Sequence, residues 1–230
     1  MPIAKQAKVS KTSSAKCFSL VPAAAQQQMY QTIAALRAVT FSKPRGTEIA
    51  QIAIRLAIGQ QDPVIVCQGA HGARAVGEDR KVANSKRIDG RLAAGTISAV
   101  TALVNDGNAI AALVCVGPLQ AEDDYRRAFS FAAQYKLPVL YLVANSLTPG
   151  RRQALDLRTL YAEFGIPVFS VEANDAIAAY RVATEALHNA RHGRGPCVIE
   201  ALTLDGHGVS KEDSLRLLRT YMERHDNWPL

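Results

Sequence analysis

The 230-residue sequence has no hydrophobic run long enough to cross a bilayer, and its first residues lack the apolar core of a secretory signal. Its four cysteines are far apart and form no CxxC pair or zinc-ligand spacing, so neither a disulfide framework nor a structural metal site is expected. Three of them, Cys67, Cys115 and Cys197, lie in apolar segments. This placement predicts buried free thiols in a reducing compartment, and therefore a cytoplasmic protein without a membrane partner.

Acidic residues are absent from positions 1–47, which contain seven Lys and Arg. The remaining residues contain 20 basic and 20 acidic side chains, so the net charge of +7 belongs to an N-terminal arm and the first helix. We interpret the arm as a solvated, flexible segment, with an organelle transit peptide as the alternative. Because the rest of the chain is neutral and no aromatic residues lie between the lysines of the arm, we expect no nucleic-acid partner.

Short apolar segments alternate with helical patterns along the rest of the chain. Strands are expected at about 64–67, 109–116, 137–144, 167–171 and 196–202. Helices are expected at about 26–39, 47–58, 92–104, 121–135, 151–164, 174–192 and 210–222, and a charged surface loop at 78–91. This alternation predicts a parallel sheet covered by helices on both faces. We expect one α/β domain at 26–230, preceded by the arm at 1–25.

The centre of the chain has the pattern of a βαβ unit, with strands at 109–116 and 137–144 and a helix between them. Glu122, Asp123 and Asp124 begin this helix, where acids interact favourably with unpaired backbone amides. Substitute metal ligands are the alternative interpretation of these three acids. Because ligands of such sheets bind where strand carboxyl ends meet helix N-termini, we expect residues 116–119 and 145–149 to border the binding site.

A family resemblance extends over about residues 29–213 and includes residues 128–139. It continues, in order along the chain, through Met29-Tyr30, Gly46-Thr47-Glu48, Ala70-His71-Gly72, Asn174-Asp175, residues 195–203 and residues 206–210. Together these segments resemble the alpha subunits of thiamine-diphosphate-dependent 2-oxo acid dehydrogenases. Those subunits are the decarboxylating components of the pyruvate, branched-chain and acetoin complexes.

The resemblance implies a three-layer αβα thiamine-diphosphate-binding fold with a mostly parallel sheet, and a role in the oxidative decarboxylation of a 2-oxo acid. It implies thiamine diphosphate and Mg²⁺ as cofactors, and assembly as a homodimer or as an α2β2 complex with a beta-type subunit. His207 and His71 are the catalytic residues by position, although a structural histidine is the alternative for each. The cofactor-binding residues by position are Gly117, Pro118, Leu119, Ser146 and Thr148.

Three positions depart from the family pattern. Gly117 stands where the family has its metal-binding Asp, or Pro118 does if the register is shifted by one, and Ser146 replaces an Asn ligand. Gln68-Gly69 replaces a Tyr-Arg pair before His71. Because Mg²⁺ prefers carboxylate and amide oxygens, we predict no side-chain metal ligand. Two hypotheses follow: a dehydrogenase alpha subunit whose catalysis is impaired by this loss, or a non-catalytic relative acting in assembly, regulation or the binding of another ligand.

Overall fold

The computed structural model describes residues 19–39, 48–59, 61–67, 85–88, 92–105, 110–116, 122–146, 157–203 and 211–225. In this part of the chain, six strands form one sheet in the order β2-β1-β3-β4-β6-β5, and every neighbouring pair is parallel. The strands are β1 (Val64–Cys67), β2 (Ser85–Ile88), β3 (Ala112–Val116), β4 (Val139–Ser146), β5 (Val168–Glu172) and β6 (Cys197–Thr203). The predicted parallel sheet is confirmed.

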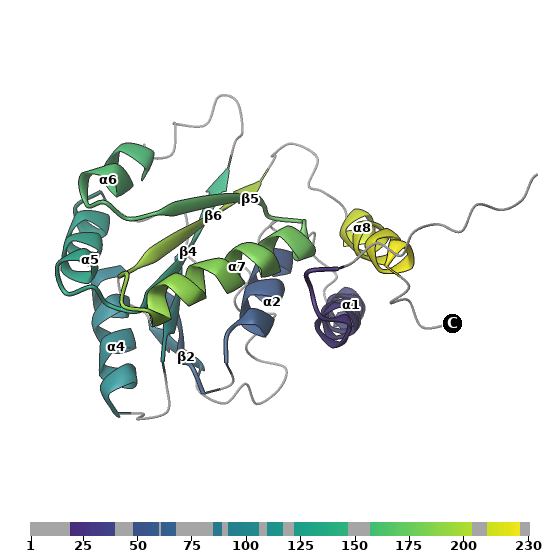
Figure 1. Ribbon diagram of the computed structural model, residues 1–230. Coiled ribbons are helices and arrows are strands. Elements are labelled where there is room, and N and C mark those ends of the chain that lie inside the picture. Colours follow the sequence, from purple (N-terminus) through teal and green to yellow (C-terminus); the bar gives the residue numbers. More distant parts are fainter. Residues whose placement is uncertain are drawn as a thin grey trace, which may run out of the picture.

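Helices cover both faces of this sheet (Figure 1). One face packs against α4 (Leu92–Asn105), α5 (Glu122–Gln134) and α6 (Leu157–Glu163). The other packs against α2 (Glu48–Ala57) and α7 (Ala176–Arg191), beyond which lie α1 (Ala23–Val39) and α8 (Lys211–Arg224). The predicted three-layer αβα architecture is confirmed. None of the helices described is long and apolar enough to span a membrane.

The central strands are buried on both faces, which explains their nearly continuous apolar sequences. In β4, Leu140 and Leu142 belong to the core beneath α2 and α7. Tyr141 and Val143 alternate with them and belong to the core beneath α4, α5 and α6. The sheet therefore separates two apolar cores, one on each side.

The expectation of a surface loop at 78–91 is wrong for residues 85–88, which form β2. This strand pairs with β1 alone and lies at the edge of the sheet. It has four residues, three of them polar, and such a short polar segment lacks the apolar pattern by which the other strands are recognised. Residues 78–84 and 89–91 lie outside the described part of the chain.

The described part of the expected N-terminal arm begins at Ser19, and its side chain contacts the helical layer. The Ser19 hydroxyl lies 3.0 Å from the Tyr221 hydroxyl of α8 and accepts from Gln26 Nε2 at 3.0 Å. Val21 is buried in the core, and α1 begins at Ala23, three residues before the expected start. These contacts hold the start of α1 against α8.

At the amino end of the strands, one buried carboxylate joins three elements. Asp62 accepts from the backbone amides of Gly59, Ile110 and Ala111 and pairs with the guanidinium of Arg191. The side chain of Asp62 is completely buried. With four donors around it, its desolvation is compensated, and the starts of β1 and β3 are held to the end of α7.

Candidate functional site

The carboxyl ends of four neighbouring strands lie together at the edge of the sheet opposite Asp62. β1 ends at Cys67, β3 at Val116, β4 at Ser146 and β6 at Thr203. The chain passes from β1 outward to β2 and then returns through α4 to β3 on the other side of β1, which makes a topological switch point between β1 and β3. Ligands of parallel α/β sheets bind outside the carboxyl ends at such a point. The strand ends therefore form the candidate site.

Of the expected catalytic and cofactor-binding residues, Ser146 is the one that lies within the described part of the chain. Val116 and Asn145, from the segments expected to border the site, lie there as well. Ser146 is the last residue of β4 and is paired in register with Thr203 of β6. The other expected site residues lie outside the described residues: His71, Gly117, Pro118, Leu119, Thr148 and His207. Each follows one of the four strand ends in sequence, and their roles remain predictions.

Near the end of β4 lies a buried carboxylate that accepts hydrogen bonds from two neighbouring side chains. Glu200 of β6 is 2% exposed. Its Oε1 accepts from Asn145 Nδ2 of β4 at 2.6 Å, and its Oε2 accepts from the Ser170 hydroxyl of β5 at 2.9 Å. The Thr203 hydroxyl donates to the backbone carbonyl of Asn145 at 3.3 Å. These bonds connect three strands immediately before Ser146.

The hydroxyl of Tyr161, on α6, is buried on the same face of the sheet, and no described residue makes a hydrogen bond with it. Burial raises the pKa of Tyr161, and the nearby Tyr125 and Glu200 raise it further. The Tyr161 ring packs 5.3 Å from that of Phe129, which in turn lies 5.0 Å from that of Tyr141. These rings fill the space between the sheet and α6, so Tyr161 stays a neutral phenol.

Two polar contacts fix α4 above the sheet. Asp124 of α5 accepts from the backbone amides of Leu92 and Ala93, the first two residues of α4. The hydroxyls of Thr96 and Tyr141 lie 3.0 Å apart in the core. The expected first-turn position of Asp124 in α5 is confirmed, but its carboxylate caps the neighbouring helix α4.

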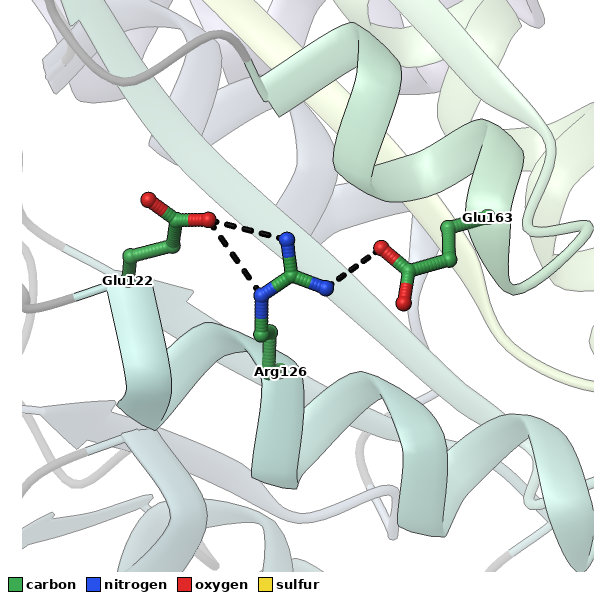
Figure 2. Close-up of polar contacts among 3 residues, drawn as sticks. All are labelled: Glu122, Arg126 and Glu163. Carbon is green, nitrogen blue, oxygen red and sulfur yellow. Dashed lines mark hydrogen bonds and ion pairs between the residues drawn. The ribbon is translucent and has the colours of Figure 1, made fainter.

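On the outer surface, an ion-pair network joins the start of α5 to the end of α6 (Figure 2). Arg126 donates through Nη2 to Glu122 Oε1 at 2.9 Å and through Nη1 to Glu163. Both acids raise the pKa of the Arg126 guanidinium. All three side chains are exposed, so the network contributes orientation more than stability.

The thiols nearest to the candidate site are not nucleophiles. Cys67 and Cys115, in the last part of β1 and β3, are buried free cysteines, as predicted. Burial raises the pKa of each to about 12, so both remain protonated at neutral pH. Nucleophilic cysteines require a lowered pKa and access to solvent, and neither thiol has these properties.

The described residues of this region do not form a side-chain site for Mg²⁺. Gly117 and Pro118 have no ligating side-chain atom. Among the described acids of this region, Glu200 accepts from two donors, Asp124 caps α4 and Glu122 pairs with Arg126. Within the described residues, no three His, Cys, Asp or Glu side chains are placed to hold a metal.

Glu200 and Ser170 were not among the residues expected at the site, whereas Asn145 lies in the segment 145–149 that was expected to border it. The sequence contained one signal for Glu200, a single acid within the apolar segment 196–202. Buried acids require partners, so such a residue predicts a polar contact. Nothing in the local sequence identified Asn145 and Ser170 as those partners, because they lie 55 and 30 positions away.

Comparison with known proteins gives the family of this chain and relatives of its fold. The model of a family described as "Dehydrogenase E1 component" matches residues 43–228. Pyruvate dehydrogenase E1 component subunit alpha of Acholeplasma laidlawii is 33% identical over 113 residues, which are 46% of this chain and 33% of the relative. The 2-oxoisovalerate dehydrogenase subunit alpha of Bacillus subtilis is 31% identical over 114 residues, 46% of this chain and 34% of the relative. The matched region therefore spans about a third of these relatives.

Two solved structures share the fold. Benzoylformate decarboxylase from Polynucleobacter necessarius superimposes with a TM-score of 0.50 at 12% identity, covering 76% of this chain and 34% of that one. A transketolase variant from Pichia stipitis gives a TM-score of 0.52 at 13% identity, covering 86% and 40%. At these identities the similarity concerns the fold alone.

Proposed function

This chain belongs to the dehydrogenase E1 component family, and we propose that it acts as the alpha-type subunit of a 2-oxo acid dehydrogenase. The observation that carries this proposal is the family match over residues 43–228, which includes the four strand ends of the candidate site. The reaction proposed is the oxidative decarboxylation of a 2-oxo acid, as the names of the alpha-subunit relatives suggest. The cellular location proposed is the cytoplasm.

The proposed assembly is a homodimer of this chain or an α2β2 complex with a beta-type subunit. One helix surface supports a subunit contact. The 14 residues of α4 include no ionisable side chain, and Ile97 and Val104 are 58% and 78% exposed. Surfaces without charge and with exposed aliphatic side chains are typical of subunit interfaces.

The proposed cofactor is thiamine diphosphate. Gly117, Pro118 and Leu119 would approach it through the backbone, and the hydroxyls of Ser146 and Thr148 would donate to diphosphate oxygens. His71 and His207 would donate to anionic oxygens of the cofactor or substrate, which imidazole can do at neutral pH. The cofactor, when bound, would supply the electron sink that decarboxylation of a 2-oxo acid requires.

A second candidate function is that of a non-catalytic relative, which keeps the fold for assembly, regulation or the binding of another ligand. The specific observation in its favour is the departure from the family pattern described above, in which Gly117 or Pro118 replaces the metal-binding Asp. The carboxylate ligates the cation that binds the diphosphate. Losing this ligand costs several kcal/mol, on the order of a thousandfold in cofactor affinity.

Calorimetric titration with thiamine diphosphate distinguishes the two candidates. The chain is titrated alone and after mixing with a beta-type partner, each time with and without Mg²⁺. We expect saturable binding in the mixed sample for a working alpha subunit. His207→Ala is then expected to reduce decarboxylation at least tenfold without lowering the midpoint of thermal unfolding. Absence of binding in every combination would exclude the first candidate and leave the non-catalytic role.

A further inference from the structure

β6 contains an acid where its pattern requires an apolar side chain. Val198 lies in the core beneath α4, α5 and α6, so the alternation of the strand directs Glu200 to the same face. Glu200 is accordingly buried, with 2% of its surface exposed, and its carboxylate accepts hydrogen bonds from Asn145 and Ser170. A buried carboxylate is costly unless its oxygens are hydrogen-bonded, and an apolar residue would avoid that cost. The acid therefore has a role beyond filling the core.

The pairing of β6 with β4 and β5 shows which part of β4 the Glu200 side chain contacts. Glu200 is directly opposite Ser170 on β5 and opposite Val143 on β4. Its carboxylate nevertheless bonds Asn145, two residues beyond Val143 toward the carboxyl end of β4. The Glu200 side chain therefore extends diagonally toward the candidate site. It contacts the carboxyl end of β4, whereas the middle of β4 is joined to β6 by backbone pairing.

Asn145 is held at two points. Its amide nitrogen donates to Glu200 at 2.6 Å, and its backbone carbonyl accepts from the Thr203 hydroxyl. The bond to a carboxylate is charge-assisted and therefore stronger than a bond between two neutral groups. It also determines which end of the amide faces Glu200, so that the carbonyl oxygen points away from it. Ser146 follows directly as the last residue of the strand.

We propose that Glu200 is a positioning residue that fixes Asn145 and, through it, the carboxyl end of β4 at the cofactor site. The effect on the strand end follows from the contacts alone, whereas the effect on the cofactor rests on the function proposed above. Because Glu200 itself is buried, its proposed effect on the site is exerted through Asn145.

Four variants separate this role from general stability. Asn145→Ala removes the positioned side chain, and Glu200→Leu removes the carboxylate. Glu200→Gln is the conservative variant, because its amide oxygen still accepts from Asn145 and its amide nitrogen can donate to the Ser170 hydroxyl. Ser170→Ala is the matched control, because it removes one bond to the same carboxylate and leaves β4 untouched.

The first readout is amide hydrogen exchange in the full chain, which needs no cofactor. We expect exchange at Ser146 to rise about tenfold in Asn145→Ala and Glu200→Leu, with Tyr141 and Leu142 in the middle of β4 unchanged. Glu200→Gln and Ser170→Ala should stay within about twofold of the wild type at Ser146. A rise spread evenly over β4, or equal rises in Ser170→Ala and Asn145→Ala, would overturn the proposal, because a merely structural role predicts those results.

The second readout is the Kd of thiamine diphosphate with Mg²⁺ in the mixed assembly. We expect it to rise about tenfold in Asn145→Ala and Glu200→Leu and to be restored in Glu200→Gln. Changed exchange with unchanged Kd would refute the role at the cofactor site. If the wild type does not bind the cofactor, the proposed catalytic function fails, and the exchange measurement still decides whether Glu200 fixes the end of β4.

Discussion

At the scale of single residues, α4 packs tightly against the sheet at Gly95. A Cβ atom at this position would lie 2.3 Å from the Sγ of Cys67, which is buried in β1. Overpacking of a core costs about 1–3 kcal/mol, more than the gain of about 1 kcal/mol expected from placing alanine in a helix. We therefore expect Gly95→Ala to lower the free energy of unfolding by about 1–2 kcal/mol, measured by urea denaturation.

A double variant tests whether this contact is the cause. Cys67→Ala removes the sulfur atom that the new methyl group would meet. The remaining neighbours of the new Cβ lie at 3.6 Å or beyond, which is ordinary contact. We expect the losses of Cys67→Ala and Gly95→Ala to be clearly non-additive, with a coupling of about 1 kcal/mol or more. Additive losses would show that Gly95 is required for another reason.

At the scale of elements, α4 is held by a cap that another helix supplies. Asp124 of α5 accepts from the amides of Leu92 and Ala93, which have no partner within their own helix. Replacing a capping residue costs about 0.5–2 kcal/mol, so we expect Asp124→Ala to lower the free energy of unfolding within this range.

Asp123 provides the control, since it occupies the same first turn of α5 and is exposed. Asp123→Ala removes the same charge near the N-terminus of α5 and is expected to cost about 0.5 kcal/mol or less. Equal losses in the two variants would mean that the charge on α5, and not the cap of α4, accounts for the effect. Urea denaturation of both variants under the same conditions measures the difference.

The predictability of the elements follows from how each is stabilised. Strands buried on both faces have apolar sequences, so β1, β3, β4 and β6 were predicted from pattern alone. β5 is an edge strand and only partly buried, but Val168, Phe169 and Val171 still made it recognisable. β2 was missed because an edge strand with polar residues resembles a loop in sequence. The candidate site was also only partly predictable from sequence. Its location at the strand ends was predicted from the alternation of strands and helices. The contact between Glu200 and Asn145 was not, because it depends on how strands distant in sequence pair.

At the scale of the whole molecule, the amino ends and the carboxyl ends of the strands, called here the amino and carboxyl edges of the sheet, are fixed by different contacts. At the amino edge, Asp62 gathers four donors from the turn before β1, the start of β3 and α7. At the carboxyl edge, Glu200 connects β4, β5 and β6 through neutral partners. Neither contact is visible in local sequence, yet both hold the strands in the register that brings the four strand ends together. The sheet therefore acts as one scaffold for segments that are far apart in the chain.

The burial of cysteine thiols in the two cores is expected to make the molecule less stable at alkaline pH. Burial raises the pKa of Cys67 and Cys115 to about 12 and that of Cys197 to about 11, above the ordinary value of 9.0. Between pH 9 and pH 11, the unfolded chain loses these protons while the folded chain keeps them. Because the folded state then binds more protons, the free energy of unfolding falls as the pH rises. By pH 10 one such thiol accounts for a loss of about 1.4 kcal/mol.

Lysine and tyrosine side chains also titrate in this range, so a variant is needed to isolate the thiols. We expect Cys115→Ala to be less stable than the wild type at pH 8, because it leaves a small cavity. Between pH 8 and pH 10, however, it should lose about 1 kcal/mol less than the wild type, since alanine has no proton to release. Urea denaturation under reducing conditions at pH 8, 9 and 10 measures both curves. Parallel curves would mean that the Cys115 thiol ionises as readily in the folded chain as in the unfolded one, and that the core around β3 is open to solvent.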